Sequence, residues 1–353
     1  MLLMMDETRI PTHWALRNHR TPSAFKANRK AGPDCINVAL VNNMPDSALE
    51  DTEAQFFELL NSAAADVSVR VTLYSLPRIP RGDRGEEHLN HFYSDITDLL
   101  NRQFDGVVIT GTEPHQSDLR KEPYWDVLTE VLQWAEHNTK STLLSCLAAH
   151  ASVLHSDGIE RHPLEDKKFG LFDDAKVMDH PLTRGTPDYM PFPHSRWNEV
   201  REDALVSNGY TVLTKSEHAG VNLFVKPKKN SLFVHFQGHP EYDAGTLLKE
   251  YRRDVKRFLR QERQTYPSVP YGYFDDAALQ VLNEFRATAV AYRNSQLVAA
   301  FPECVVANMK SSAWHSPAVC LYRNWLQFIA SERRPILMPP PEVRVGLDEA
   351  TDY

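Results

Sequence analysis

The sequence lacks an excess of positive charge and any long apolar run. Its 39 Lys and Arg residues are outnumbered by 47 Asp and Glu residues, which gives a formal net charge of −8. Nucleic-acid surfaces need clustered Lys and Arg, so this balance argues against a nucleic-acid partner. A membrane span needs about 20 consecutive apolar residues, and the opening MLLMM is too short for a span or a signal peptide. We therefore expect a cytoplasmic protein with no membrane partner.

Cysteine is also scarce. The four cysteines, Cys35, Cys146, Cys304 and Cys320, are far apart and form no C-x-x-C motif. This excludes the usual patterns of a zinc site or a disulfide framework, so no metal is expected. We interpret Cys35, Cys304 and Cys320 as buried small side chains. Cys146 differs because of its place in the chain.

Composition divides the chain into three parts. Residues 1–34 are polar and rich in Arg, Lys, Pro and Asn, which predicts an N-terminal arm, a solvated tail rather than a docking segment. Residues 35–335 are predicted to form the globular domain, including helices near its C-terminal end. Residues 336–353 are rich in Pro and acidic side chains and are predicted to be a tail.

Strand and helix patterns alternate through most of the domain. We expect buried strands at 36–44, 67–76, 104–112, 141–146 and 231–242 and helices at 46–63, 92–103, 123–138 and 245–262, with a loop at 77–88. Residues 160–235 have a looser pattern with short strands. This order predicts an α/β fold with a mostly parallel sheet flanked by helices, and with extra C-terminal helices.

Three of these strands end in residues that can do chemistry. TGTEPH follows one strand at 110–115, Cys146 ends another, and GHPEYD at 238–243 ends a third. Because ligands in open α/β sheets bind beyond the carboxyl ends of the strands, we expect the three segments to converge on one crevice.

Cys146 lies where a strand is predicted to become a helix. The positive end of that helix favours a thiolate, and the amide of Leu147 would face a developing oxyanion. His239 is the candidate base, and Glu241, on the same side of an extended segment, would orient it. The ordinary alternatives are that Cys146 packs at a strand end and that His239 is a loop residue before a proline. The residues alone leave both open.

Longer motifs resemble a known family. LVNNMPDSALEDTEAQFFELL, FDGVVITGTEP, KKFGLF, PHSRW, GHPEYDAGTLLKEYRRDV and VPYGYF are similar, in register over residues 36–330, to the homoserine O-acyltransferases (homoserine O-succinyltransferases) of methionine biosynthesis. The resemblance implies a class I glutamine-amidotransferase-like, flavodoxin-like fold and a homodimer. It also implies transfer of an acetyl or succinyl group from acyl-CoA, through an acyl-cysteine, to homoserine or a relative such as serine. No permanently bound cofactor is implied.

The resemblance also implies roles for single residues. It places the acyl-accepting thiol on Cys146, the general base on His239, its orienting carboxylate on Glu241, the amino acid's carboxylate partner on Arg253, a substrate contact on Ser195, and the active-site lysine on Lys167. Lys168 competes with Lys167 for the last role. The ordinary alternatives are a solvated helix face for Arg253 and loop charge for Lys167.

The chain departs from the family pattern at two places. It has C-L-A-A-H-A where relatives have C-W-A-x-Q-A, so Leu147 and His150 replace an aromatic residue and an amide. In the loop where Gly accompanies succinyl donors and Glu accompanies acetyl donors, the register gives His115. His115 would either fill the acyl pocket and favour acetyl, or pair with a succinyl carboxylate.

Two other functions stay open at this stage. One is a glutaminase or amidohydrolase on the same fold, although such enzymes usually have Gly where this chain has Leu144 and Ala148. The other is a non-catalytic relative that binds acyl-CoA.

Overall fold

The structure is a computed structural model that describes residues 3–5, 35–64, 67–303, 305 and 313–333. Most of the predicted N-terminal arm, the predicted tail at 336–353 and Cys304 lie outside the described residues. Residues 3–5 of the predicted arm form an edge strand that pairs with residues 69–71.

The described residues form one ten-stranded sheet, in the order β1-β3-β2-β4-β5-β10-β9-β8-β6-β7. The strands are β1 (Leu3–Met5), β2 (Ile36–Val41), β3 (Val69–Tyr74), β4 (Gly106–Ile109), β5 (Ser141–Ser145), β6 (His162–Lys176), β7 (Tyr189–Glu199), β8 (Thr211–Ser216), β9 (Gly220–Lys228) and β10 (Ser231–Phe236). From β1 to β10 every pairing is parallel, and from β10 to β7 every pairing is antiparallel. The α/β class is confirmed, but the sheet is mixed rather than mostly parallel. Strand β6 was not predicted from the sequence. Its first half is polar and only partly buried, so it lacks the alternation of apolar and polar residues that indicates a strand.

The helices are α2 (Asp46–Ala63), α3 (Asp83–Phe92), α4 (Ile96–Leu100), α5 (Trp125–Asn138), α6 (Leu147–Asp157), α7 (Glu202–Ser207), α8 (Thr246–Leu259), α9 (Asp276–Ala291) and α10 (His315–Arg333), with short 3₁₀ segments η2 (Leu119–Lys121), η3 (Pro181–Thr183) and η4 (Ser295–Ala300). Helix α2 has the expected bounds. The loop expected at 77–88 was wrong in its second half, where α3 begins. Its Gly85 packs closely on α2, since a Cβ there would lie 2.1 Å from Oδ1 of Asp46.

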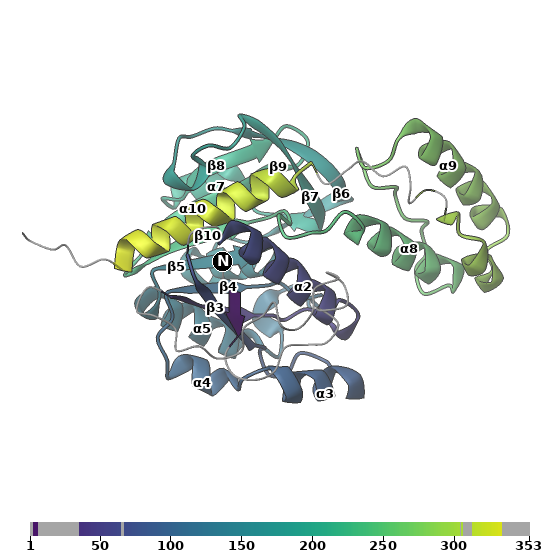
Figure 1. Cartoon of the computed structure of the whole chain (residues 1–353). Helices are drawn as coiled ribbons and strands as arrows, with labels where there is room; N and C mark the ends of the chain where they lie inside the picture. The colour runs from purple at the N-terminus through teal and green to yellow at the C-terminus, as the bar shows by residue number, and fades with distance from the viewer. Residues whose placement is uncertain (1–2, 6–34, 65–66, 304, 306–312, 334–353) are drawn as a thin grey trace, which may run out of the picture.

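Helices cover both faces of the sheet (Figure 1). One apolar cluster joins α2 and α10 to the sheet, and a second joins α5 and α6 to the opposite face. Helix α10 lies directly on β4, because a Cβ at Gly106 would be 2.7 Å from Cδ1 of Ile329. Burial of each large apolar side chain contributes about 1.5–3 kcal/mol, so these layers fix the sheet firmly.

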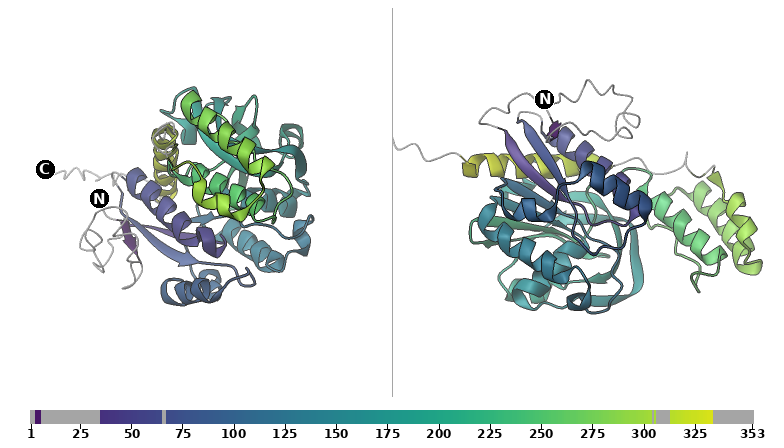
Figure 2. Two further views of the ribbon diagram at one scale, coloured as in Figure 1. Left: turned by 90° about the vertical axis from the view of Figure 1, so that its right-hand side faces the viewer. Right: turned by 90° about the horizontal axis from the view of Figure 1, so that it is seen from below.

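Helices α8 and α9 project from the side of this body, as Figures 1 and 2 show. They have their own apolar cluster, which includes Tyr251, Phe258, Leu282 and Trp314 and reaches Phe169 on β6. The extra C-terminal helices expected from the sequence are therefore present, and α8 reaches the edge of the sheet where the strands end. No helix in the described ranges is long and apolar enough to cross a bilayer.

Candidate active site

Cys146 occupies a sharp turn between β5 and α6. Its φ is +52° and its ψ is −110°, which is a costly conformation for a residue with a Cβ. The turn is held from both sides, because the Cys146 amide donates to the Phe236 carbonyl at 2.8 Å and the Ala149 amide donates to the Cys146 carbonyl at 3.0 Å. The turn therefore presents the thiol at the carboxyl edge of the sheet.

His239 lies beside Cys146 because β10 pairs in parallel with β5, with Phe236 opposite Ser145. Its Nδ1 is 2.8 Å from Oε1 of Glu241, and both side chains are buried. The segment is a turn, since the Tyr242 amide donates to the His239 carbonyl. The expected contact is present, but the extended geometry assumed for it was wrong. The Tyr242 ring stacks on the imidazole with centroids 4.3 Å apart.

The electrostatics of His239 favour an imidazolium. Burial is the largest influence and lowers its pKa, but the Glu241 carboxylate and the Cys146 thiolate outweigh it, so the pKa is raised well above its ordinary value. Glu241 takes Nδ1, which leaves Nε2 for the sulfur. The arrangement suits a thiolate–imidazolium pair with the carboxylate as its third member.

The amide of Leu147 is the first N–H of α6, where a helix leaves its amides without internal partners. Gly111, after β4, lies against it. A Cβ at Gly111 would be 3.0 Å from the Leu147 nitrogen and 2.9 Å from the Leu147 Cβ. The absence of a side chain at residue 111 therefore keeps the space beside this amide open to a substrate oxygen.

A cavity of about 270 Å³ opens over Cys146. It collects residues from α2, the loop after β4, the β5–α6 turn, the residues before and within β6, strand β7, the turn after β10, and helix α8. The lining residues used below are Gly111, Glu113, Pro114, Cys146, Leu147, His150, Arg161, Lys167, Ser195, Arg196, His239, Glu241, Tyr242, Glu250, Arg253, Asp254 and Arg257.

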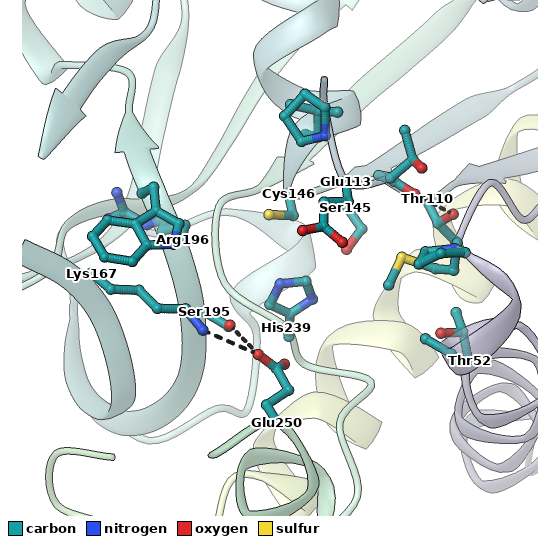
Figure 3. Close-up of a pocket in the computed structure, with 18 of the residues that line it drawn as sticks. Thr52, Thr110, Glu113, Ser145, Cys146, Lys167, Ser195, Arg196, His239 and Glu250 are labelled. Atoms are coloured by element: carbon teal, nitrogen blue, oxygen red, sulfur yellow. Dashed lines mark hydrogen bonds and ion pairs between the residues drawn. The ribbon is translucent and has the colours of Figure 1, made fainter. Parts of the chain in front are cut away.

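Glu250 on α8 joins several of these side chains. Its Oε2 accepts from Ser195 Oγ at 2.5 Å and from Lys167 Nζ at 3.3 Å (Figure 3). Its Oε1 accepts from the Tyr242 hydroxyl at 2.7 Å. Burial acts to raise its pKa, but Lys167 and these hydrogen bonds hold the pKa below its usual value. Sequence reasoning missed Glu250, although its position three residues before Arg253 on one helix face was a usable signal.

Arg253 and Lys167 both line the cavity. Arg253 Nε donates to Asp254 Oδ1 at 3.2 Å, and its side chain is 39% exposed. It is therefore at the mouth of the cavity rather than on a fully solvated face. Lys167 Nζ lies 4.0 Å from the centroid of the Phe169 ring. Lys168 lines a neighbouring pocket instead, so the geometry favours Lys167 of the two.

His115 is not part of this cavity. It is exposed, and its amide donates to Glu122 Oε1 at 2.6 Å. The Gln116 amide donates to the same oxygen. The loop lines the cavity with residues 110–114 but not with His115, so the expected contact of His115 with the acyl group stays a prediction. The Glu113 carboxylate is 3.6 Å from the Arg257 guanidinium.

His150 is a buried partner of the turn that carries His239. Its Nε2 is 2.8 Å from Oε1 of Gln237, which also accepts from the Val200 amide. Burial is the main reason that the pKa of His150 is lowered to about 3. The histidine is therefore neutral and replaces the amide of the family pattern as a hydrogen-bonding residue.

Comparison with known proteins gives consistent matches. The family model described as homoserine O-succinyltransferase matches residues 10–336. The homoserine O-succinyltransferase of Methylorubrum extorquens is 45% identical over 84% of this chain and 87% of its own length. The protein of that name from Rhodopseudomonas palustris is 43% identical over 86% of this chain and 91% of its own.

Solved structures give more distant matches. A glutamine amidotransferase from Thermotoga maritima is 15% identical with a TM-score of 0.42, over 83% of this chain and 98% of its own. A glutamine amido transferase from Methylobacillus flagellatus is 13% identical with a TM-score of 0.46, over 84% of this chain and 96% of its own. No functional argument follows from similarity at this level.

Proposed function

The chain belongs to the homoserine O-succinyltransferase family, and from this premise we propose that Cys146, His239 and Glu241 carry out its acyl-CoA-dependent O-acylation of homoserine. The observation that supports these roles best is their meeting in one cavity. The thiol, the imidazole and the carboxylate come from two distant chain segments, and Leu147, the residue after Cys146, lines the same cavity.

In the first step the Cys146 thiolate attacks the thioester carbonyl carbon of acyl-CoA. The carbonyl oxygen becomes an oxyanion beside the Leu147 amide and the space at Gly111. The tetrahedral intermediate then collapses, the bond to the CoA sulfur breaks, and the His239 imidazolium gives its proton to that sulfur. The products are an acyl-Cys146 thioester and free CoA.

In the second step His239 acts as the base. Acylation removes the thiolate charge, which is one of the two influences that raise the pKa of His239, while burial still lowers it. The pKa of His239 is therefore lower after acylation, which favours the neutral imidazole that can accept a proton. It takes the hydroxyl proton of homoserine as that oxygen attacks the thioester carbon, and Cys146 leaves as the thiolate with the O-acylated product.

The α8 side of the cavity suits a zwitterionic amino acid. Arg253 would hold the substrate carboxylate through its guanidinium, and the Glu250 carboxylate would accept from the ammonium group. Ser195 and Lys167 hold Glu250 in place. Homoserine is the proposed acceptor, and serine is the closest competitor by chemistry.

Two measurements test the proposal. Wild-type protein is mixed with acetyl-CoA or succinyl-CoA and with homoserine or serine, and products are identified by mass spectrometry. We expect succinyl-CoA with homoserine to be the most efficient pair. Without acceptor, succinyl-CoA should add one succinyl group to the protein, and the Cys146→Ala variant should add none and form no product. Transfer at the original rate by Cys146→Ala would exclude the mechanism.

The alternative activities, the cellular location and the oligomeric state are tested by separate experiments. Incubation with glutamine and an ammonia assay would reveal a glutaminase. Alkylation of Cys146 that acyl-CoA does not block would favour a non-catalytic relative. A cytoplasmic location and a homodimer remain predictions, which fractionation and light scattering can test.

A further inference from the structure

The cavity over Cys146 has two electrostatically different ends. At the α8 end, cationic and acidic side chains pair directly, as in Lys167 with Glu250 and Arg253 with Asp254. At the end formed by the residue before β6 and by β7, the charged side chains are Arg161 and Arg196. Among the described residues neither has a carboxylate closer than 4.0 Å, so the acidic side chains that act on them are more distant than those at the α8 end.

Arg161 has hydrogen bonds but no ion pair within the described residues. One of its terminal nitrogens donates to the backbone carbonyls of Gln116 at 3.2 Å and Ser117 at 3.0 Å. These bonds fix the side chain without neutralising it. The nearby Glu122 forms no salt bridge with it, and Oε1 of Glu122 already accepts from two loop amides. The guanidinium therefore lines the cavity without a direct ion pair, although the Glu122 and Asp118 carboxylates act on its charge from further away.

Arg196 supports the same end from β7. Its side chain is only 2% exposed, and it donates to the carbonyls of Asn198 and Ala219 and to Nδ1 of His194. Its closest carboxylate, on Glu199, is 4.0 Å away. Burial is the main influence that lowers the pKa of both guanidinium groups, and a Cys146 thiolate acts on each in the opposite direction. Both cations are thus close enough to Cys146 to interact with its charge.

We propose that Arg161, supported by Arg196, binds the terminal carboxylate of a dicarboxylic acyl group while that group is attached to Cys146. This inference rests on the proposed function and assigns the donor specificity to named residues. A succinyl thioester carries its free carboxylate two methylene groups from the reacting carbonyl. Pro114 and Leu147 supply apolar surface for those methylenes. A half-buried guanidinium with no direct ion pair gains a charge-assisted hydrogen bond from such a carboxylate.

Glu113, the acidic residue of the loop after β4, is paired with a different arginine than Arg161. Its carboxylate pairs with Arg257 on α8 and acts on Arg253. The acidic residue of the loop therefore faces the amino acid end, and among the described residues it forms no ion pair with Arg161.

The test compares succinyl-CoA with butyryl-CoA, which has the same chain length but a methyl group in place of the carboxylate. Homoserine is the acceptor, and the quantity measured is the ratio of the two kcat/KM values. The wild type should favour succinyl-CoA, and Arg161→Gln should lower the ratio about 10- to 100-fold, the usual effect of a lost charge-assisted bond. Arg161→Lys should keep part of the preference.

Arg120→Gln is the matched control, because Arg120 is an exposed residue of η2, outside the cavity, and pairs with Asp118 and Glu160. It should leave the ratio at the wild-type value. A ratio that Arg161→Gln does not change, or an equal loss with both donors, overturns the proposal. Absence of transfer from every acyl-CoA in the wild type contradicts the proposed function instead.

If Arg161→Gln fails to fold, as judged by circular dichroism, Arg161→Lys decides with the same ratio of kcat/KM values. Its point charge cannot reproduce the geometry of the guanidinium, so it should lower the ratio below the wild-type value. A wild-type ratio in the folded Arg161→Lys variant would overturn the proposal.

Discussion

The amide of Gly238 donates a 2.7 Å hydrogen bond to Oδ1 of Asn222, a fully buried residue on β9. Asn222 Nδ2 in turn donates to Asp174 Oδ2 at 2.6 Å. Gly238 directly precedes His239, and a Cβ there would lie 2.9 Å from the same Asn222 oxygen. These hydrogen bonds hold the turn that carries the His239 imidazole to the buried side chains of Asn222 and Asp174.

Asn222→Ala should loosen this turn. The substitution removes the acceptor of the Gly238 amide and one of the donors to Oδ2 of Asp174. Each buried polar group that loses a hydrogen-bond partner lowers the stability by about 1–3 kcal/mol. We expect a lower free energy of unfolding in urea, and a reduced kcat at temperatures where the variant is folded. Asn230→Ala, at an exposed residue, is the control. An unchanged kcat in the folded variant would contradict a positioning role for Asn222.

Asp174 should make stability depend on pH. Burial is the main cause that raises the pKa of its carboxyl from 3.8 to about 7, against the hydrogen bonds from Asn222 and Thr214. The folded state therefore holds this proton more tightly than the unfolded state, so stability falls as pH rises between about 4 and 7.

The Asp174→Asn variant lacks this titration. Its stability relative to the wild type should therefore improve as pH rises across that window, by up to about 1.4 kcal/mol per pH unit. Urea unfolding at several pH values gives the difference. A difference that stays constant with pH would show that Asp174 does not titrate there.

Gly111→Ala should damage the transition state more than substrate binding. The added methyl would approach both the nitrogen and the Cβ of Leu147 and crowd the space for the oxyanion. Loss of one oxyanion donor costs about 10²–10³ in kcat, and we expect a fall of this order with a small change in KM. Gly82→Ala, whose new Cβ would meet only Asp46 at 3.5 Å, is the control. Equal kcat values for the two variants would argue against an oxyanion site at Leu147.

Arg253→Met should weaken binding of the amino acid. Loss of a charge-assisted bond to its carboxylate predicts a KM for homoserine about 10- to 100-fold higher, with a smaller effect on the KM for acyl-CoA. Arg252→Met is the matched control on the same helix, because Arg252 is outside the cavity and pairs with Glu303. If both variants raise the KM for homoserine equally, Arg253 contributes only general positive charge.

The parallel half of the fold could be read from the sequence because local patterns specify it. The run at 36–44 and the helix at 46–63 appear where expected, since buried strands are continuously apolar and amphipathic helices repeat every 3.6 residues. The antiparallel half of the sheet was harder to predict from the sequence. In β6 the exposed, charged first half gives no periodic signal, and pairing with β7 forms the strand.

The candidate site divides in the same way. Cys146, His239 and Glu241 were found because each stands at a strand end, and the carboxyl ends of parallel strands share one edge. A register could not show that His115 is exposed in a loop whose amides at 115 and 116 both donate to Glu122. Glu250 was missed because its partners come from β6, β7 and the turn after β10.

The sequence by itself determined the α/β class and the three side chains proposed to carry the chemistry, because periodicity and strand-end position are local properties of a chain. Only the tertiary structure decided which charged side chains around Cys146 form close ion pairs and which do not. That distinction depends on distances between segments far apart in the chain. Arg161 and Arg253 are the same residue type, and only their neighbours make one a candidate for the acyl carboxylate and the other for the amino acid.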